Sequence, residues 1–226
     1  MLNITDVYNR LKEEVKDEKG LIKFSLGSIS IEIHGKDSMG NLIQEWLGHW
    51  FQKTNISYEV LENTQEFPDY LLQLDGENTT YLEIKSWNYN NSPAFDLANF
   101  DSYINSLSNN PKKIDADYLI FGYEINEQGF KIKDIFLKKI WELEGPAKNY
   151  PVRIQVKKGV VYNLRPINFK SDNTESFATR LEFFNHLIDT RIMFKNQGKK
   201  AQTEEEIRSW GEEIKDFYKK QTGNNM

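Results

Sequence analysis

Three charged side chains in one short stretch of the sequence have the types and spacing for phosphodiester hydrolysis. In "FPDYLLQLDGENTTYLEIKSW", residues 67–87, Asp69 follows a proline, and Glu83 and Lys85 lie further along. Two carboxylates side by side repel each other, so a divalent cation with oxygen ligands is favourable between them. A Lewis acid, an activated water and a cation for developing charge are the parts that this hydrolysis needs.

The competing interpretation is a surface ion pair on an ordinary hairpin. Because side chains alternate along a strand, Glu83 and Lys85 share one face and Ile84 points to the other. Asp75-Gly76 predicts the hairpin turn, so that Asp69, at the start of the partner strand, approaches Glu83. This placement favours a metal-dependent site over a surface ion pair.

The motif resembles the signature of the PD-(D/E)xK nucleases, with "PD" at 68–69 and "EIK" at 83–85. Many members of that superfamily carry a glutamate on the helix before the hairpin, and Glu45 lies on the helix expected at 40–52. The order of elements from 40 to 108 matches the superfamily's αβββαβ core.

The resemblance implies a role for each of these residues. Asp69 and Glu83 would bind Mg²⁺ together with the backbone carbonyl of Ile84, and Mn²⁺ would be able to substitute. Lys85 would orient water and stabilise the transition state. Glu45 would hold a second ion or a metal-bound water.

Within the superfamily, size and element order resemble the EcoRV-like branch of type II restriction endonucleases. The stretch "GVVYNLRPINF", residues 159–169, is similar to NgoBV-type restriction enzymes. The resemblance implies a cytoplasmic homodimer that cuts double-stranded DNA at a short specific site, with a cognate DNA methyltransferase in the same system. It also implies DNA contacts from the loop after Lys85, through Asn88, Tyr89, Asn90 and Asn91. A structure-selective repair or recombination nuclease, and a non-catalytic DNA-binding protein, stay open as alternatives.

Composition excludes several other classes of protein and site. The 226 residues are 38% hydrophobic and 28% charged, too aromatic for a disordered chain and too polar for a membrane protein. No apolar run approaches the roughly 18 residues of a transmembrane helix, and the acidic first residues predict no signal peptide. There is no cysteine and the three histidines are scattered, so we expect oxygen ligands at any metal site.

The net charge of −5 conceals an uneven distribution. Residues 1–110 carry 8 Lys and Arg against 17 Asp and Glu, whereas residues 111–226 carry 21 against 17. The segment 145–171 contains no acid, which suits a polyanion such as DNA. We expect phosphate contacts from two lysines and base contacts from five further side chains: Lys157, Lys158, Arg153, Gln155, Asn163, Arg165 and Asn168. The alternative is a basic, solvated hairpin.

Hydrophobic periodicity predicts the elements around these residues. Expected helices cover 3–18, 38–55, 92–108, 176–194 and 203–220. Expected strands lie on both sides of Gly27 and at 57–61, 67–87, 116–125 and 151–169, and residues 130–143 are expected to form a strand that runs into a short helix. This is α/β, one restriction-endonuclease-like domain with a mixed central sheet flanked by helices. Residues 1–39 are the candidate dimerisation region, 40–125 the catalytic core, and 126–226 the DNA-recognition region with the C-terminal helices.

A few remaining side chains have simpler expected roles. Trp46 and Trp50 are expected in the core. His49 is expected at the edge of its helix rather than at a site water. Glu32 and Asp96 are expected to be surface charges, and the last helix is expected to pack or to form a dimer contact.

Overall fold

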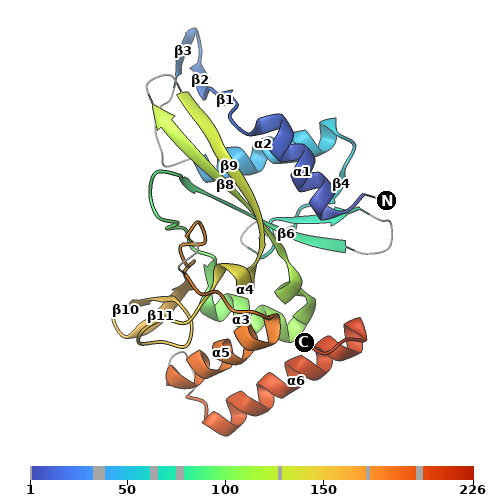
Figure 1. Cartoon of the computed structure of the whole chain (residues 1–226), viewed down its shortest axis with the longest axis vertical. Helices are drawn as coiled ribbons and strands as arrows, with labels where there is room; N and C mark the ends of the chain where they lie inside the picture. Colours follow the sequence, from blue (N-terminus) through green and yellow to red (C-terminus); the bar gives the residue numbers. More distant parts are fainter. Residues whose placement is uncertain are drawn as a thin grey trace. The chain divides into compact units, whose positions relative to one another are not determined.

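The computed structural model describes residues 2–32, 39–61, 66–74, 79–126, 129–171, 174–196 and 201–226. The chain forms two compact units (Figure 1). Unit 1 comprises Met1–Pro93 and Asp117–Lys138, and unit 2 comprises Ala94–Ala116 and Lys139–Met226. The single-domain organisation and its three regions remain predictions from the sequence.

Unit 1 contains a six-stranded mixed sheet. Its order is β1 (Lys19–Gly20), β9 (Gly129–Lys139), β8 (Asp117–Asn126), β6 (Thr79–Asn88), β5 (Tyr70–Gln73) and β4 (Ser57–Glu59). The pairs β4–β5, β5–β6 and β1–β9 are antiparallel, and β6–β8 is parallel. The expected α/β class with a mixed central sheet is confirmed.

Helices α1 (Ile4–Val15) and α2 (Met39–Lys53) pack against this sheet, as Figure 1 shows. Asn3 caps α1 by accepting a 3.0 Å hydrogen bond from the N–H of Asp6. Apolar side chains at helical spacing then bury one stripe of each helix. The buried stripes contain Val7 and Leu11 in α1, and Ile43, Leu47 and Phe51 in α2.

The prediction that both tryptophans of α2 are core residues was half right. Trp50 is 6% exposed, and its Nε1–H donates a 2.7 Å hydrogen bond to Glu14. Trp46 is 43% exposed, because it lies at the border of the apolar stripe. It lines an open cavity instead of the core.

A separate hairpin precedes α2. It consists of β2 (Lys23–Leu26) and β3 (Ile29–Glu32), joined by a turn in which Gly27 has φ +59°. The predicted strands around Gly27 are therefore confirmed up to residue 32, and Ile33 lies outside the described residues. Every residue of both strands is exposed.

Unit 2 combines helices with a small sheet. The helices are α3 (Phe100–Asn109), the 3₁₀ helix η1 (Pro111–Asp115), α4 (Ile140–Leu143), α5 (Arg180–Met193) and α6 (Glu204–Thr222), and the sheet order is β10 (Ile154–Lys157), β11 (Val160–Leu164) and β7 (Ala98–Asn99). A capping box of Thr203 and Glu206 opens α6.

The helix predicted over 92–108 begins later than expected, at Phe100. The residues before it pair with β11 instead, with Ala98 opposite Leu164. Asn99 then caps α3 by accepting a 3.0 Å hydrogen bond from the N–H of Ser102. The helix therefore starts after the Asn99 cap and the strand pairing, and not at residue 92.

The chain order α2, β4, β5, β6, α3, β8 reproduces the expected αβββαβ order. None of the helices in the described ranges is both long and apolar enough to cross a membrane.

Candidate active site

The β5–β6 hairpin brings the two predicted carboxylates together. Tyr70 pairs with Leu82, so Asp69, just before β5, comes level with Glu83. The N–H of Asp69 donates a 3.2 Å hydrogen bond to Glu83 Oε2. In return, the N–H of Ile84 donates a 2.7 Å hydrogen bond to Asp69 Oδ2. Backbone N–H groups of the two paired segments thus hold both carboxylates in place, that of Asp69 on Glu83 and that of Ile84 on Asp69.

Lys85 completes this group from the same face of β6. Its Nζ lies 2.8 Å from Glu83 Oε1. The Glu83 residue is 8% exposed and the Lys85 side chain 19% exposed, so both are largely withdrawn from water. Such a pair in the interior of β6 is not a solvated surface ion pair.

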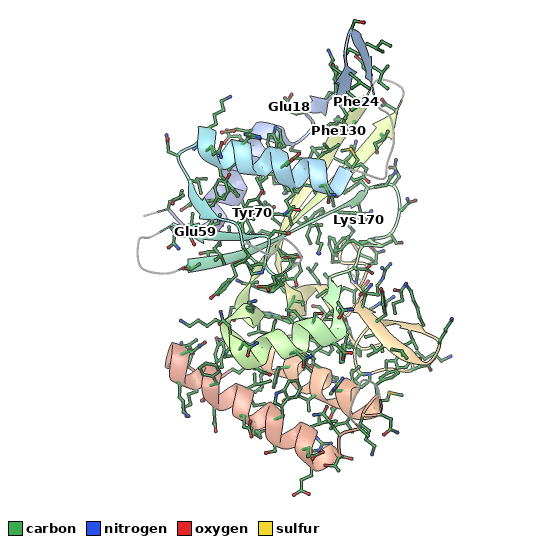
Figure 2. All side chains as sticks on the ribbon, turned by 180° about the vertical axis from the view of Figure 1, so that it is seen from behind. Glu18, Phe24, Glu59, Tyr70, Phe130 and Lys170 are labelled. Atoms are coloured by element: carbon green, nitrogen blue, oxygen red, sulfur yellow. The ribbon has the colours of Figure 1, made fainter. Side chains whose placement is uncertain are left out.

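Helix α2 contributes Gln44, which the sequence interpretation missed. Gln44 Nε2 donates a 2.9 Å hydrogen bond to Asp69 Oδ1, and the Tyr70 hydroxyl donates a 2.6 Å hydrogen bond to the Gln44 carbonyl. Tyr70 is labelled in Figure 2 on the strand below the helix. Glu45, the predicted helix residue, and His49 both have exposed side chains. The available sequence signal for Gln44 was its place directly after the buried Ile43.

Burial dominates the electrostatics of the two carboxylates. It raises the pKa of Glu83 to about 7, helped by the negative charge of Asp69 and opposed by Lys85. It also raises the pKa of Asp69, against hydrogen bonds from Ile84 and Gln44 and the charge of Lys85. The positive charge of Lys85 therefore does not fully compensate the two buried carboxylates of Asp69 and Glu83.

These donors suit a hard divalent cation. Carboxylate and carbonyl oxygens are the ligands that Mg²⁺ prefers, and two adjacent, buried carboxylates gain from its charge. Within the described ranges, no group of three or more His, Cys, Asp or Glu side chains is placed to hold a metal. Among the residues of those ranges, a ligand set built on Asp69 and Glu83 would need oxygens other than side-chain carboxylates.

The loop after Lys85 is partly packed against the sheet. The N–H of Tyr89 donates a 2.8 Å hydrogen bond to the Tyr123 carbonyl. The centroid of the Tyr89 ring lies 5.7 Å from that of the Trp87 ring. A Cβ on Gly122 would come within 2.4 Å of the Tyr89 ring, so that ring packs against β8. Asn88 accepts a 3.1 Å hydrogen bond from the N–H of Asn90. The loop thus exposes Asn90 and Asn91.

In unit 2, the predicted basic hairpin is formed by β10 and β11. Lys158 and Gly159 form its turn, both with positive φ. Arg153, Lys157 and Lys158 are exposed. Lys157 Nζ lies 4.2 Å from the ring centroid of Tyr162, which is 46% exposed and which the sequence interpretation missed. Alternation along β11 could have identified Tyr162 as an outward residue.

Four of the five predicted base readers are less available in the free protein. Asn163 is 7% exposed, and the Asn168 Oδ1 atom is buried, while Gln155, opposite Asn163 in the hairpin, is half-buried. Arg165 forms an ion pair with Asp96 and donates a 3.0 Å hydrogen bond to the Ala94 carbonyl. Arg165 must leave Asp96 before it can contact a base.

A buried carboxylate at the base of this hairpin also went unnoticed in the sequence. Glu144 is fully buried, and its Oε2 accepts hydrogen bonds from the N–H groups of Arg153 at 3.1 Å and Gly145 at 3.3 Å. Burial raises the pKa of Glu144 well above its usual range, against the lowering effect of these N–H groups. Its position after a short helix offered no signal, because only the folded chain surrounds it.

Comparisons with known proteins agree with this fold. The model of the NgoBV restriction endonuclease family matches residues 1–226. The type II restriction enzyme NlaIV of Neisseria lactamica is 35% identical over 225 residues, 97% of this chain and 90% of that relative. The type II restriction enzyme NgoBV of Neisseria gonorrhoeae is 35% identical over 161 residues, 70% of this chain and 91% of that relative.

A solved structure of an NlaIV restriction endonuclease matches with a TM-score of 0.86 at 33% identity, covering 100% of this chain and 92% of that one. The resemblance to type II restriction enzymes is confirmed, and the repair-nuclease and non-catalytic alternatives are set aside. The chain therefore belongs to the NgoBV restriction endonuclease family and is a type II restriction endonuclease.

Proposed function

We propose that Asp69, Glu83 and Lys85 form the catalytic centre, with Mg²⁺ as the cofactor and Mn²⁺ able to substitute. The observation that carries the proposal is the interlocked pair of carboxylates with a lysine 2.8 Å from one of them, in a chain of this family. Asp69, Glu83 and the carbonyl of Ile84 would hold the metal. When bound, Mg²⁺ supplies Lewis-acid chemistry and lowers the pKa of water.

The chain's own groups prepare this centre. Gln44 and the N–H of Ile84 orient Asp69, and the N–H of Asp69 and the Lys85 ammonium orient Glu83. Preorganised groups of this kind need not rearrange as charge develops on the phosphate. Lys85 contributes a fixed positive charge for the transition state and a donor that orients the attacking water.

The reaction is hydrolysis of one phosphodiester bond in each strand. Water attacks phosphorus in line with the bond to O3′, that bond breaks, and O3′ takes a proton. The products are a 5′-phosphate and a 3′-hydroxyl. Glu45 remains the sequence-based candidate for a second ion or a metal-bound water, from an exposed position next to Gln44.

DNA contacts are assigned to two surfaces, one in each unit. The loop of Asn88–Asn91 follows the catalytic lysine directly. In the β10–β11 hairpin, Lys157 and Lys158 would contact phosphates, and Arg165, with its neighbours on the hairpin, would contact base edges in the major groove. The acid-free segment 145–171 supports this assignment.

We further propose that the enzyme acts as a C₂ homodimer in the cytoplasm, where a cognate methyltransferase protects the host DNA. Two sites related by a two-fold axis are the simplest way to cut both strands of a symmetric sequence. Digestion of one plasmid with Mg²⁺ tests the function: we expect discrete bands with 5′-phosphate ends. A smear, or intact plasmid under conditions where the chain binds DNA, would contradict site-specific cleavage.

A further inference from the structure

Both ends of the β10–β11 hairpin are held by one short segment of unit 2, residues 143–145 at the C-terminal end of α4. The N–H of Arg153, just before β10, donates a 3.1 Å hydrogen bond to the Glu144 side chain. The N–H of Ile167, after β11, donates a 2.8 Å hydrogen bond to the Leu143 carbonyl. We call these two contacts the hairpin clamp, because together they fix where the hairpin begins and where it ends.

Arg165 lies at the base of the hairpin, close to the clamp in the chain. Its N–H donates a 2.9 Å hydrogen bond to the Arg153 carbonyl, and the buried Pro166 follows it. A residue before proline is restricted to extended backbone, so the direction of the chain at Arg165 has two constraints. The two arginines predicted to read bases are thus joined through their backbones, and the position of Arg153 depends in turn on Glu144.

The segment that forms the clamp has little room to move. Leu143 and Glu144 are both completely buried. A Cβ on Gly145 would come within 2.2 Å of the Glu175 carbonyl oxygen. The Glu144 carbonyl accepts a 3.1 Å hydrogen bond from the N–H of Phe177. Because closely packed groups surround the segment, the clamp gives Arg153 a fixed position.

A buried carboxyl is an unfavourable way to hold a hairpin. Glu144 Oε2 accepts hydrogen bonds from the N–H groups of Arg153 and Gly145, but Glu144 Oε1 is buried and has no hydrogen-bond partner in the part of the chain that the structure describes. Withdrawing such an oxygen from water costs free energy. What the side chain supplies is an acceptor at one fixed point in the interior, where the first N–H of the hairpin meets it.

We propose that Glu144 is a positioning residue for sequence recognition, which sets through the hairpin clamp where Arg153 and Arg165 meet the base edges of bound DNA. A bidentate contact between arginine and guanine needs two N–H groups to reach O6 and N7 at once, and a shift of about 1 Å takes one of them out of range. Lys157 and Lys158 tolerate such a shift, because an ammonium on a flexible stem contacts phosphate as a point charge. The inference rests on the base-reading role of the hairpin in the proposed function and names the residue that sets its geometry.

Titration of cognate and random duplexes in Ca²⁺, without cutting, tests the inference. The cognate duplex is the one that mapping of the plasmid ends defines. In Glu144→Ala the ratio of cognate to random affinity should fall at least ~10-fold, about the contribution of one good contact between arginine and a base. Glu144→Gln keeps an oxygen acceptor for Arg153 and should stay within about 2-fold of the wild-type ratio. An unchanged ratio in Glu144→Ala, or an equal fall in Glu144→Gln, overturns the inference.

A second buried substitution separates positioning from a general loss of stability. Ile214→Ala removes a side chain that is 2% exposed on α6, and it should lower the stability of the chain without changing the ratio. Urea unfolding shows that each variant is folded in the assay. If Glu144→Ala does not fold, Glu144→Asp takes its place: it draws the carboxylate back by one C–C bond, about 1.5 Å, and should lower the ratio at least ~5-fold. An equal fall in Ile214→Ala would overturn the inference.

A double-mutant cycle tests whether Glu144 acts through the two arginines. In an Arg153→Ala/Arg165→Ala chain, the further change Glu144→Ala should alter cognate affinity less than about 2-fold, and additive losses overturn the inference. The same chain separates the two levels of the proposal. If it keeps the wild-type ratio, the base-reading role of the hairpin fails and the inference fails with it. If its ratio falls and that of Glu144→Ala does not, only the inference fails.

Discussion

Gln44 on α2 donates a 2.9 Å hydrogen bond to Asp69 at the entrance of β5. The Tyr70 hydroxyl ties the backbone of the same glutamine to the hairpin at 2.6 Å. A helix and a strand that meet only in the folded chain thus orient one of the two site carboxylates. Groups that orient metal-binding side chains typically contribute 10- to 100-fold to affinity or activity.

Gln44→Ala should therefore reduce cleavage about 10-fold at saturating Mg²⁺, by leaving Asp69 with one hydrogen bond fewer. We expect a smaller loss for Glu45→Ala, because the Glu45 side chain is exposed. Rates under single-turnover conditions make the comparison. A larger loss for Glu45→Ala would support the helix carboxylate predicted from the sequence instead.

Lys85→Ala and Asp69→Ala should each lower the cleavage rate by at least ~10²-fold, as removal of one preorganised electrostatic group does. The affinity for DNA should stay close to that of wild type. It is measured in Ca²⁺, so that DNA is bound without being cut. Near-normal cutting by either variant with Mg²⁺ would show that the catalytic centre lies elsewhere.

Lys157→Ala and Lys158→Ala should weaken binding to cognate and random DNA alike. Both side chains are exposed at the hairpin tip, and phosphate contacts carry no sequence information. Each substitution should also reduce the slope of log affinity against log salt by about 1. Titrations at two salt concentrations measure both effects. An unchanged slope would show that the hairpin is a solvated surface that makes no phosphate contact.

Arg165→Ala should cost about 1–3 kcal/mol on the cognate site and little on random DNA. Since Asp96 holds Arg165 in the free protein, Asp96→Asn should have the opposite sign and tighten cognate binding by up to about 5-fold. Weaker cognate binding of the Asp96→Asn variant would show that the ion pair itself belongs to the binding conformation.

The buried Glu144 makes the stability of unit 2 depend on pH. Its pKa is raised in the folded chain, so the folded state binds this proton more tightly than the unfolded state does. The favourable contribution is complete below the unfolded pKa near 4.5 and is lost as pH rises towards the folded value. Glu144→Gln removes this dependence, so its free energy of unfolding relative to wild type should rise from acid to neutral pH.

Urea unfolding at several pH values measures that difference. Glu144→Ala provides the matched control: it also lacks the titrating group, but it leaves the N–H groups of Arg153 and Gly145 without their acceptor, so it should be about 1–3 kcal/mol less stable than Glu144→Gln at every pH. If the free energies of unfolding of wild type and Glu144→Gln differ by the same amount at every pH, Glu144 keeps an ordinary pKa in the folded chain.

The sequence by itself determined the parts of this protein that depend on local pattern. The alternation around Glu83 and Lys85 placed both on one face of β6, and the structure joins them at 2.8 Å. Helical spacing identified α1 and α2, and the mixed α/β class followed from the order of elements. These features are set by side-chain direction and burial within a few residues, which a sequence contains in full.

The tertiary structure decided what depends on the neighbours that the fold brings in. In the folded chain Gln44 donates a hydrogen bond to Asp69, and Trp46 lines a cavity instead of the core. Helix α3 begins at Phe100 because the preceding residues pair with β11. The fold also buried Glu144 beneath the basic hairpin and left every residue of β2 and β3 exposed. Each outcome depends on a partner distant in the chain, and the free energy of such a contact has no periodic signature in the residues that make it.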